Sequence, residues 1–374
     1  MINIERLKNK FLSYVTIASE SNKEKAMCDY LKNSLEALGY KVMTYAPLQE
    51  YPSTGYTLEV VVPGDASLEG IILAAHVDTV TPGENVQPHI DNDGYVRSLG
   101  DTVLGGDDKS GVAALMELLE ALKEKEVRHC PLQIFFTIQE EIGCLGSRAI
   151  PQEKLAFKQA VVLDSSGDVG RVVISSPGHL KIASTILGKA SHAGNNPEGG
   201  ISAIRVMAKA IENMHLQRID EETTANIGSF IAEGATNIIS EKASITAEIR
   251  SRNPEKLRAE ERHMYSTLVD ACASMGAQLE YEITGESFGY NISPSSSVLK
   301  RLERACDKVG CHFFTAASGG GSDANVFNQR GITAVNIATG MEKVHGKEER
   351  ISLLNLTRCG QLLWYLVTDS CSEN

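Results

Sequence analysis

Apolar and polar positions along the first part of the chain follow helical and strand spacings in turn. Residues 4–18 and 23–38 have apolar side chains at helical spacing, and Gly39 fits the C-cap of the second helix. Strands are predicted at 41–45, 57–62 and 71–79. The segment 71–79, IILAAHVDT, is apolar at consecutive positions, which is typical of a strand covered on both faces.

The same alternation continues to about residue 178. A glycine-rich, acidic stretch at 98–111 opens a helix at 112–125, and strands follow that end at Glu140 and span 159–167. Strands that alternate with helices predict an α/β fold, with a mixed β-sheet and helices on both faces.

From His179 the pattern changes. It predicts short strands and two helices in an order like β-α-β-β-α-β over about 110 residues, with strands at 180–190, 244–251 and 277–285 and helices at 201–214 and 253–276. The α/β pattern then resumes, with helices at 297–310 and 352–369 and a strand at 332–340. We therefore expect a discontinuous first domain, 1–178 and 292–374, and an inserted smaller α+β (ferredoxin-like) domain, 179–291.

Length and composition agree with this division. A chain of 374 residues is long enough for two domains, and 42% apolar and 22% charged residues describe an ordinary globular protein. The net charge of −12 argues against a nucleic-acid partner, which is usually met by a basic patch. The N-terminal segment has no apolar signal core, and no apolar run is long enough to span a membrane, so we expect a cytoplasmic protein.

Eight cysteines are spread along the chain without a CxxC pair or zinc-finger spacing to histidines. Their pattern favours reduced, mostly buried thiols, as in a cytosolic protein.

Polar residues with metal-binding side chains stand where the apolar strands end. In an open α/β sheet, ligands gather at the carboxyl ends of the strands. The candidates are His76, Asp78, Asp107, Asp108, Glu140, Glu141, Asp164 and His345. Together they form an oxygen and nitrogen donor set without thiolate, which suits zinc, manganese or cobalt.

Each candidate also has an ordinary interpretation. A histidine at a strand end is commonly just hydrogen-bonded, and Asp107-Asp108 before a helix would serve as an N-cap. The doublet Glu140-Glu141 is harder to explain in this way, because two neighbouring carboxylates repel each other unless a positive charge offsets them.

Six short motifs then carry a resemblance to a known family. In chain order they are HVDTV, LGGDDKSG, EEIG, LDSSG, GGGSDAN and a late HG. This series resembles the di-zinc metallo-exopeptidases related to peptidase T, carboxypeptidase G and the aminoacylases, and is most similar to peptidase T-like proteins. The likeness covers almost the whole chain, including the inserted domain.

The resemblance implies a role for each candidate. His76 and Asp164 would hold one zinc ion, Glu141 and His345 the other, and Asp107 would bridge both through a loop whose Asp107–Asp108 peptide bond is cis. Two zinc ions per chain are implied, with cobalt or manganese as alternatives. Asp78 would orient His76, and Glu140 would be the general base, since a base must not also serve as a ligand.

The resemblance also implies functional residues in the second half of the chain. His192, in the segment ASHAG, would stabilise the oxyanion across a homodimer interface formed by the inserted domain, which would also act as a lid. Asn237 and Arg250 would bind the substrate carboxylate, and Gly320 and Gly321 would line the substrate pocket. The ordinary interpretations are a surface histidine, a salt-bridged arginine and a plain tight turn.

Three functions are compatible with these residues. A tripeptide aminopeptidase is favoured, because Asp rather than Glu at position 164 tends to accompany aminopeptidases in this family. The second is an N-acyl amino-acid amidohydrolase or carboxypeptidase that uses the same site. The third, a catalytically silent binding module, disagrees with the complete set of ligands and base.

Overall fold

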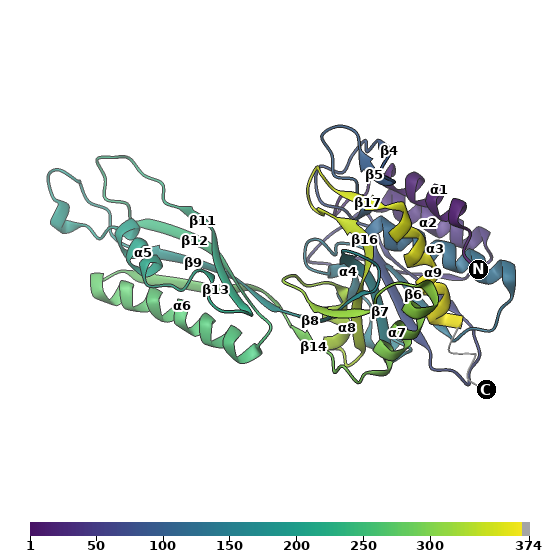
Figure 1. Cartoon of the computed structure of the whole chain (residues 1–374). Coiled ribbons are helices and arrows are strands. Elements are labelled where there is room, and N and C mark those ends of the chain that lie inside the picture. Colours follow the sequence, from purple (N-terminus) through teal and green to yellow (C-terminus); the bar gives the residue numbers. More distant parts are fainter. Residues whose placement is uncertain (369–374) are drawn as a thin grey trace. The chain divides into compact units, whose positions relative to one another are not determined.

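The computed structural model describes residues 1–368, and the predicted end of the last helix at residue 369 and Cys371 lie outside this range. The chain divides into two compact units. The first comprises Met1–Ile174, Ile292–Ala317 and the chain from Ser322 onward, and the second comprises Ser175–Asn291 with Ser318–Gly321. In Figure 1 the second unit is the teal and green part of the chain between two stretches of the first.

A large mixed sheet forms the centre of the first unit. Its main strand order is β1 (Val42–Tyr45), β2 (Thr57–Val62), β6 (Leu132–Thr137), β3 (Ile71–His76), β7 (Gln159–Ser166), β16 (Thr333–Glu342), β17 (Arg350–Ser352), β5 (Tyr95–Ser98) and β4 (Pro88–Ile90). β8 (Arg171–Ser176) pairs with β16 and with β15 (Phe314–Ala317). The neighbours β6, β3, β7 and β16 run parallel, so their carboxyl ends lie at one edge of the sheet.

Helices cover both faces of this sheet, which confirms the predicted fold class. The helices of the first unit are α1 (Ile4–Val15), α2 (Lys25–Ala37), α3 (Gly106–Lys125), α4 (Leu145–Arg148), α7 (Ser297–Val309), α8 (Asp323–Gln329) and α9 (Leu353–Thr368). Alternate residues of β6 show the two faces. Ile134 and Phe136 belong to the core that also contains residues of α1, α3 and α9, whereas the ring of Phe135 lies 6.2 Å from that of Phe327 in α8.

The N-terminal helix is anchored to α3 by a buried acid. The Glu117 side chain is fully buried and pairs with Arg6 at 2.6 Å and Lys10 at 3.0 Å. A buried carboxylate needs such partners, because its desolvation is otherwise uncompensated.

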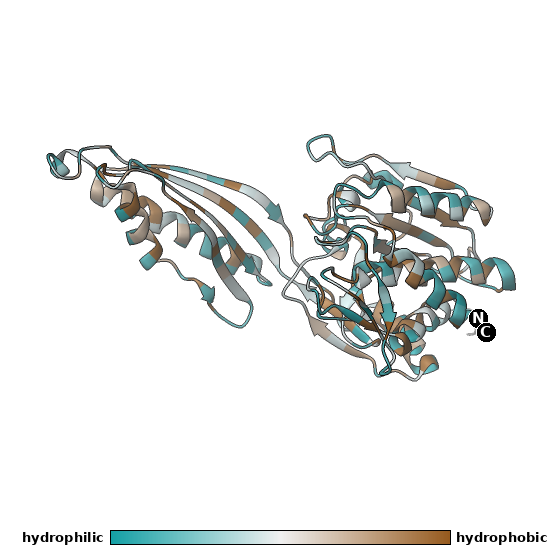
Figure 2. Cartoon of the chain, turned by 90° about the horizontal axis from the view of Figure 1, so that it is seen from above, coloured by the Kyte–Doolittle hydropathy of each residue, from teal (hydrophilic) through white to brown (hydrophobic). Residues whose placement is uncertain are grey.

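The second unit is an antiparallel five-stranded sheet with two helices, α5 (Ala203–Glu212) and α6 (Pro254–Met275). Its strand order is β10 (Gln217–Arg218), β11 (Thr223–Ile231), β12 (Lys242–Ser251), β9 (Gly178–Leu187) and β13 (Gln278–Ser287). Hydrophobic and hydrophilic residues alternate along its long strands (Figure 2), and the buried ones form a core of their own with the two helices. No helix within residues 1–368 combines the length and the apolar character that crossing a membrane requires.

Candidate metal centre

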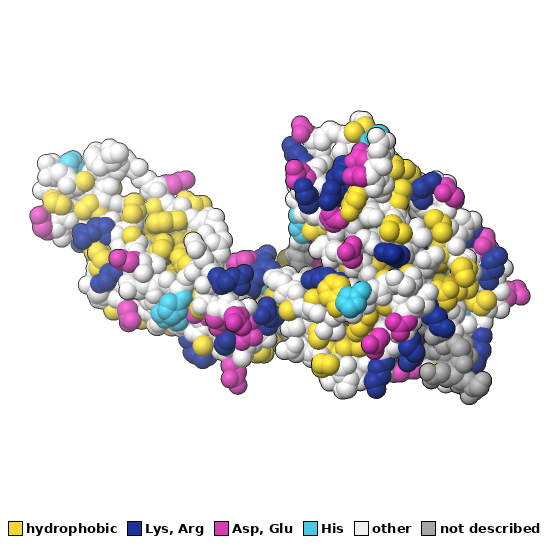
Figure 3. Space-filling model, in the orientation of Figure 1, with side chains coloured by type: hydrophobic (Ala, Val, Ile, Leu, Met, Phe, Trp, Pro, Cys, Tyr) yellow, Lys and Arg dark blue, Asp and Glu magenta, His cyan; other side chains and the backbone are white. Residues whose placement is uncertain are grey.

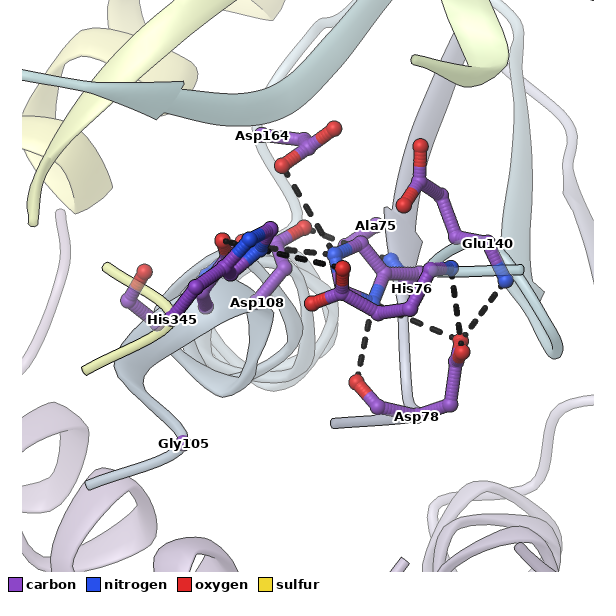
Figure 4. Close-up of polar contacts among 12 residues, drawn as sticks. Ala75, His76, Asp78, Gly105, Asp108, Glu140, Asp164 and His345 are labelled. Atoms are coloured by element: carbon purple, nitrogen blue, oxygen red, sulfur yellow. Dashed lines mark hydrogen bonds and ion pairs between the residues drawn. The ribbon is translucent and has the colours of Figure 1, made fainter. Parts of the chain in front are cut away.

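Four neighbouring parallel strands bring the candidate ligands to one edge of the sheet. His76 is the last residue of β3, Asp164 lies near the end of β7, and Glu140-Glu141 follow β6. His345 follows β16. Figure 4 shows the side chains of Asp164 and His345 converging on the region of His76.

Asp107 stands between the two histidines. Its Oδ1 lies 3.1 Å from His76 Nε2, and its Oδ2 lies 3.2 Å from His345 Nε2. One carboxylate thus presents a different oxygen to each imidazole. The Asp107–Asp108 peptide bond is cis, as the resemblance implies.

Each histidine has a second carboxylate of its own. His345 Nε2 lies 3.0 Å from Glu141 Oε2, and His76 Nε2 lies 3.6 Å from Asp164 Oδ1. The structure therefore assembles two His–carboxylate pairs that share Asp107, which is the grouping implied by the resemblance.

These residues fit divalent cations on three counts. Two ligands of one tetrahedral zinc ion, each about 2.0–2.1 Å from the metal, stand about 3.3 Å apart, close to the distances between these side-chain atoms. Glu141 Oε1 is buried and has no hydrogen-bond partner among the described residues. Within residues 1–368 no lysine or arginine forms an ion pair with Asp107, Glu141 or Asp164, so only the imidazoles offset their charge.

The pKa shifts within the cluster also favour the binding of cations. Burial, and next the charge of Asp107, raise the pKa of Asp164 to about 8. Contacts with Asp107 and Glu141 raise the pKa of His345 to about 11. Asp164 and His345 thus retain protons at neutral pH, and cations that bind here displace those protons.

Asp78 holds both His76 and the glutamate doublet. The Nδ1 of His76 donates to the backbone carbonyl of Asp78 at 2.9 Å, and the Asp78 carboxylate lies 3.4 Å from the same nitrogen. Donation from Nδ1 to this carbonyl makes Nε2, which faces Asp107 and Asp164, the nitrogen that can bind a metal once it loses its proton. The Asp78 carboxylate also accepts the backbone N–H groups of Glu140 at 3.0 Å and Glu141 at 3.2 Å.

Glu140 lies beside the cluster: no ion pair joins it to His76 or His345 in the described structure, although one of its oxygens lies within 4.8 Å of donor atoms of His76 and Asp164. Burial, followed by the charge of Asp164, raises the pKa of its carboxyl group well above the ordinary value. Its Oε1 accepts a hydrogen bond from the Cys144 thiol at 3.3 Å. A carboxylate with a raised pKa beside a reaction centre suits proton transfer near neutral pH.

The neighbouring Asp108 supports the loop instead of facing the histidines. Its Oδ1 accepts the N–H of Gly111 at 3.0 Å, and its Oδ2 accepts the N–H of His76 at 3.3 Å. The helix-capping interpretation of Asp107-Asp108 therefore describes Asp108, whereas Asp107 takes part in the cluster.

Two buried acids near the cluster are not among the residues that the sequence predicts. Glu349 accepts the backbone N–H groups of Leu104, Gly105 and Asp107 at 2.8, 2.8 and 2.9 Å. Asp323 accepts hydroxyl hydrogen bonds from residues of β6 and α4. Asp323 lies within the GGGSDAN motif, so the sequence offered a signal from which it could have been found. Glu349 lies in the charged segment GKEER, where the sequence indicates an ordinary surface residue.

The remaining candidates lie in the second unit, where His192 and Asn237 occupy adjacent loops. The Ala193 N–H donates to the Asn237 carbonyl at 2.9 Å, and His192 Nδ1 accepts the N–H groups of Gly194 and Asn195 at 3.1 and 3.0 Å. These contacts hold the His192 ring in a fixed turn.

Arg250, on β12, lies next to the glycine segment. Its Nε donates to Glu248 at 3.0 Å, which is the salt bridge of the ordinary interpretation, and one terminal nitrogen lies 3.5 Å from the Gly319 carbonyl. Gly320 and Gly321 belong to the same segment of the unit, and the Gly320 carbonyl accepts the Ser176 hydroxyl at 2.8 Å.

Comparison with known proteins identifies the class. Residues 72–369 match peptidase family M20/M25/M40. The chain is 37% identical over 370 residues to the uncharacterized protein YqjE of Bacillus subtilis (strain 168), covering 99% of this chain and 100% of that protein.

Two solved structures are similar over essentially the full length. One is a tripeptidase from Staphylococcus aureus subsp. aureus Mu50, with a TM-score of 0.95, 34% identity and complete coverage of both chains. The other is the aminopeptidase PepT from Bacillus cereus ATCC 10987, with a TM-score of 0.90, 35% identity and coverage of 99% of this chain and 100% of that one. The protein belongs to peptidase family M20/M25/M40 and is a peptide-bond hydrolase.

Proposed function

We propose that this protein is a two-metal aminopeptidase that releases the first residue of short peptides, tripeptides above all. The observation that carries the proposal is Asp107, one carboxylate facing two His–carboxylate pairs, with the separate acid Glu140 beside them. The two similar structures, a tripeptidase and an aminopeptidase, support the same activity.

We assign His76, Asp107 and Asp164 to one ion and His345, Asp107 and Glu141 to the other. The donor set suits zinc, with cobalt or manganese as alternatives. When bound, two such ions polarise the scissile carbonyl group and lower the pKa of the attacking water.

Glu140 moves the proton. Its Oε1 is engaged by the Cys144 thiol, which leaves Oε2 to accept a proton from water and to deliver it to the leaving amine. Asp78 keeps this carboxylate in position by binding the backbone N–H of Glu140, and the same acid orients His76.

Residues of the second unit bind and polarise the substrate in this proposal. Arg250 and Asn237 bind the substrate carboxylate, His192 donates to the oxyanion, and Gly320 and Gly321 line the pocket. The guanidinium nitrogen 3.5 Å from the Gly319 carbonyl makes only a marginal hydrogen bond there and is available to a ligand.

We also propose a cytoplasmic homodimer that assembles through the second unit. The exposed hydrophobic residues of that unit include Phe230 at 44%, Ile231 at 58% and Ile238 at 49%. All seven described cysteines are free, which agrees with a reducing compartment.

A substrate panel tests the activity. Di-, tri- and tetrapeptides and N-acetyl amino acids are incubated with the zinc-loaded protein, and the products are identified. Release of the N-terminal residue, fastest from tripeptides, is expected. Faster hydrolysis of N-acetyl amino acids would instead establish the amidohydrolase alternative.

A mixing experiment tests whether His192 acts across the dimer. His192→Ala and Glu140→Ala are each expected to be nearly inactive. After subunit exchange, half of the dimers are hybrids with one complete site, so roughly a quarter of the parent rate is expected. No recovery after exchange verified by mass would mean that His192 serves its own chain.

A further inference from the structure

A second cluster of metal-binding side chains lies on the second unit, apart from all residues assigned to catalysis. Glu260 and His263 are three residues apart on α6 and therefore share one face of that helix. His215 reaches them from the turn between α5 and β10. One donor atom from each of the three lies within 4.8 Å of the others.

Glu260 is a buried acid whose charge is only partly matched. Its side chain is 9% exposed, and His215 Nδ1 lies 3.2 Å from one of its oxygens. The other oxygen, Oε1, is buried without a hydrogen-bond partner among the described residues. Lys256, one helical turn earlier, pairs with Asp220 and Glu222 at 2.9 and 2.7 Å instead. A buried carboxylate oxygen without a partner is costly, and a bound cation would remove that cost.

His263 is held as a metal-binding histidine commonly is. Its Nε2 lies 3.1 Å from the carbonyl oxygen of Asn213. A carbonyl only accepts, so Nε2 carries the hydrogen and Nδ1 keeps its lone pair. Donation of one ring N–H to a backbone carbonyl is the usual support for a ligating imidazole.

His215 is the most exposed member of the cluster. Histidine side chains reach the surface of the second unit (Figure 3), and 58% of the His215 side chain is exposed. Its ring is stacked on that of His263, with 3.9 Å between the ring centroids and 15° between the planes. The nitrogen lone pairs lie in the ring planes, so the His215 ring must turn out of the stack before both rings can bind one ion. Its exposure allows this rotation.

We propose that His215, Glu260 and His263 bind one first-row divalent metal ion, Zn²⁺ in the first place, at a third site of the chain. Two imidazoles and one carboxylate suit zinc, copper or nickel, whereas calcium and magnesium prefer oxygen ligands alone. Three protein ligands leave a coordination position for water. The bound ion ties the turn after α5 to α6 and thereby stabilises the second unit.

The alternative is a cluster that needs no ion. A protonated His215 would neutralise Glu260 while stacking on His263, and the metal-free contacts would be the same. The two interpretations differ in what they predict for metal binding.

The number of zinc ions bound per chain distinguishes the metal site from the metal-free cluster. Three proteins are dialysed against the same free Zn²⁺ concentration at neutral pH, and the zinc bound per chain is measured. They are the parent, His215→Ala and the control His312→Ala, which replaces an exposed histidine of the first unit. His215→Ala is expected to hold one ion fewer than the parent, and His312→Ala the same number as the parent. Equal zinc in parent and His215→Ala would overturn the proposal. Because the measured quantity is a difference, it does not depend on occupancy of the centre proposed for catalysis.

A second measurement tests Glu260, the buried residue of the cluster. Glu260→Gln keeps the size of the side chain and removes its charge, and circular dichroism checks that the variant is folded. Zinc is expected to raise the unfolding temperature of the parent more than that of either Glu260→Gln or His215→Ala. The peptidase activity of His215→Ala is expected to stay at the parent level. An equal zinc-dependent shift in folded parent and variants would overturn the proposal.

Discussion

Glu140 and Glu141 are adjacent in the chain but have different surroundings. The Glu141 carboxylate faces His345 at 3.0 Å, and its second oxygen has no hydrogen-bond partner among the described residues, whereas the Glu140 carboxylate accepts a thiol hydrogen bond from Cys144. The first arrangement suits a ligand and the second a base. We therefore propose that the doublet, which looked electrostatically unfavourable in the sequence, is divided between these two tasks.

This division predicts that Glu140→Ala impairs catalysis without loss of metal, whereas Glu141→Ala loses metal. Glu140→Ala is expected to lower kcat by ~10²–10⁴-fold, the usual contribution of a general base, while the metal content stays at the parent level. Steady-state rates on a tripeptide and elemental analysis give the two quantities. Parent-like hydrolysis by a fully metal-loaded Glu140→Ala protein would refute the proposed mechanism.

Glu141→Ala and His345→Ala should both lose metal, because their side chains face the same space. Each is expected to hold one ion fewer per chain than the parent, since the pair His76 and Asp164 remains intact. Elemental analysis after dialysis in parallel with the parent measures this. Retention of the full metal content by both variants would show that these residues are not ligands.

The buried acid Glu349 anchors the segment at the start of α3. Glu349 accepts three backbone N–H groups of the segment that presents Asp107. Burial raises the pKa of Glu349 to about 7, although the three hydrogen bonds favour its ionised form. The carboxylate thus fixes the loop without contacting either histidine.

Replacement of Glu349 should consequently weaken metal binding and stability together. Glu349→Ala is expected to lower the free energy of unfolding by about 1.5–3 kcal/mol, since donors to a charged acceptor lose their partner. Metal affinity is expected to fall roughly 10–100-fold, as for other residues that support ligands. Urea unfolding and chelator competition measure the two effects.

Glu348 provides the matched control for this prediction. Its side chain is 79% exposed and pairs with Lys343 on the surface. Glu348→Ala should change neither stability nor affinity appreciably. Similar losses in both variants would indicate a general charge effect and not a specific role of Glu349.

Each of the two units has a hydrophobic core of its own. The core of the first unit includes Ile134, and the core of the second includes Leu268, each completely buried. Within residues 1–368 the two cores share no residue. Each unit therefore has the buried apolar surface that local stability requires.

Core substitutions are accordingly expected to act locally. Leu268→Ala should destabilise by about 2–5 kcal/mol and reduce amide protection mainly within 175–291. Ile134→Ala should reduce protection mainly in the first unit. Hydrogen exchange followed by mass spectrometry maps both. Equal loss of protection in both units for either variant would show that they unfold together.

Much of the fold could be predicted because its signals are local. The apolar run 71–79 predicts a covered strand, and β3 is buried between two parallel neighbours. β11 was not located, because its sequence TTANIGSFI contains small and polar residues and its burial depends on pairing with β12. The strand that begins at Ile71 ends at His76 and not at residue 79, since its last residues turn into the site.

The sequence by itself determined the alternation of strands and helices, the insertion, the donor residues at the strand ends and the family. These features follow from periodicity, composition and short motifs, which are local properties of the sequence. The family resemblance implied that Asp107 joins two His–carboxylate pairs, but only the tertiary structure gave the contacts and distances that bring these donors together. It turned Asp107 toward two histidines and Asp108 toward a helix end, placed Glu349 beneath the loop, and gathered His215, Glu260 and His263 on another unit. Such contacts join residues distant in the chain, and their distances depend on strand register and burial, which no local pattern specifies.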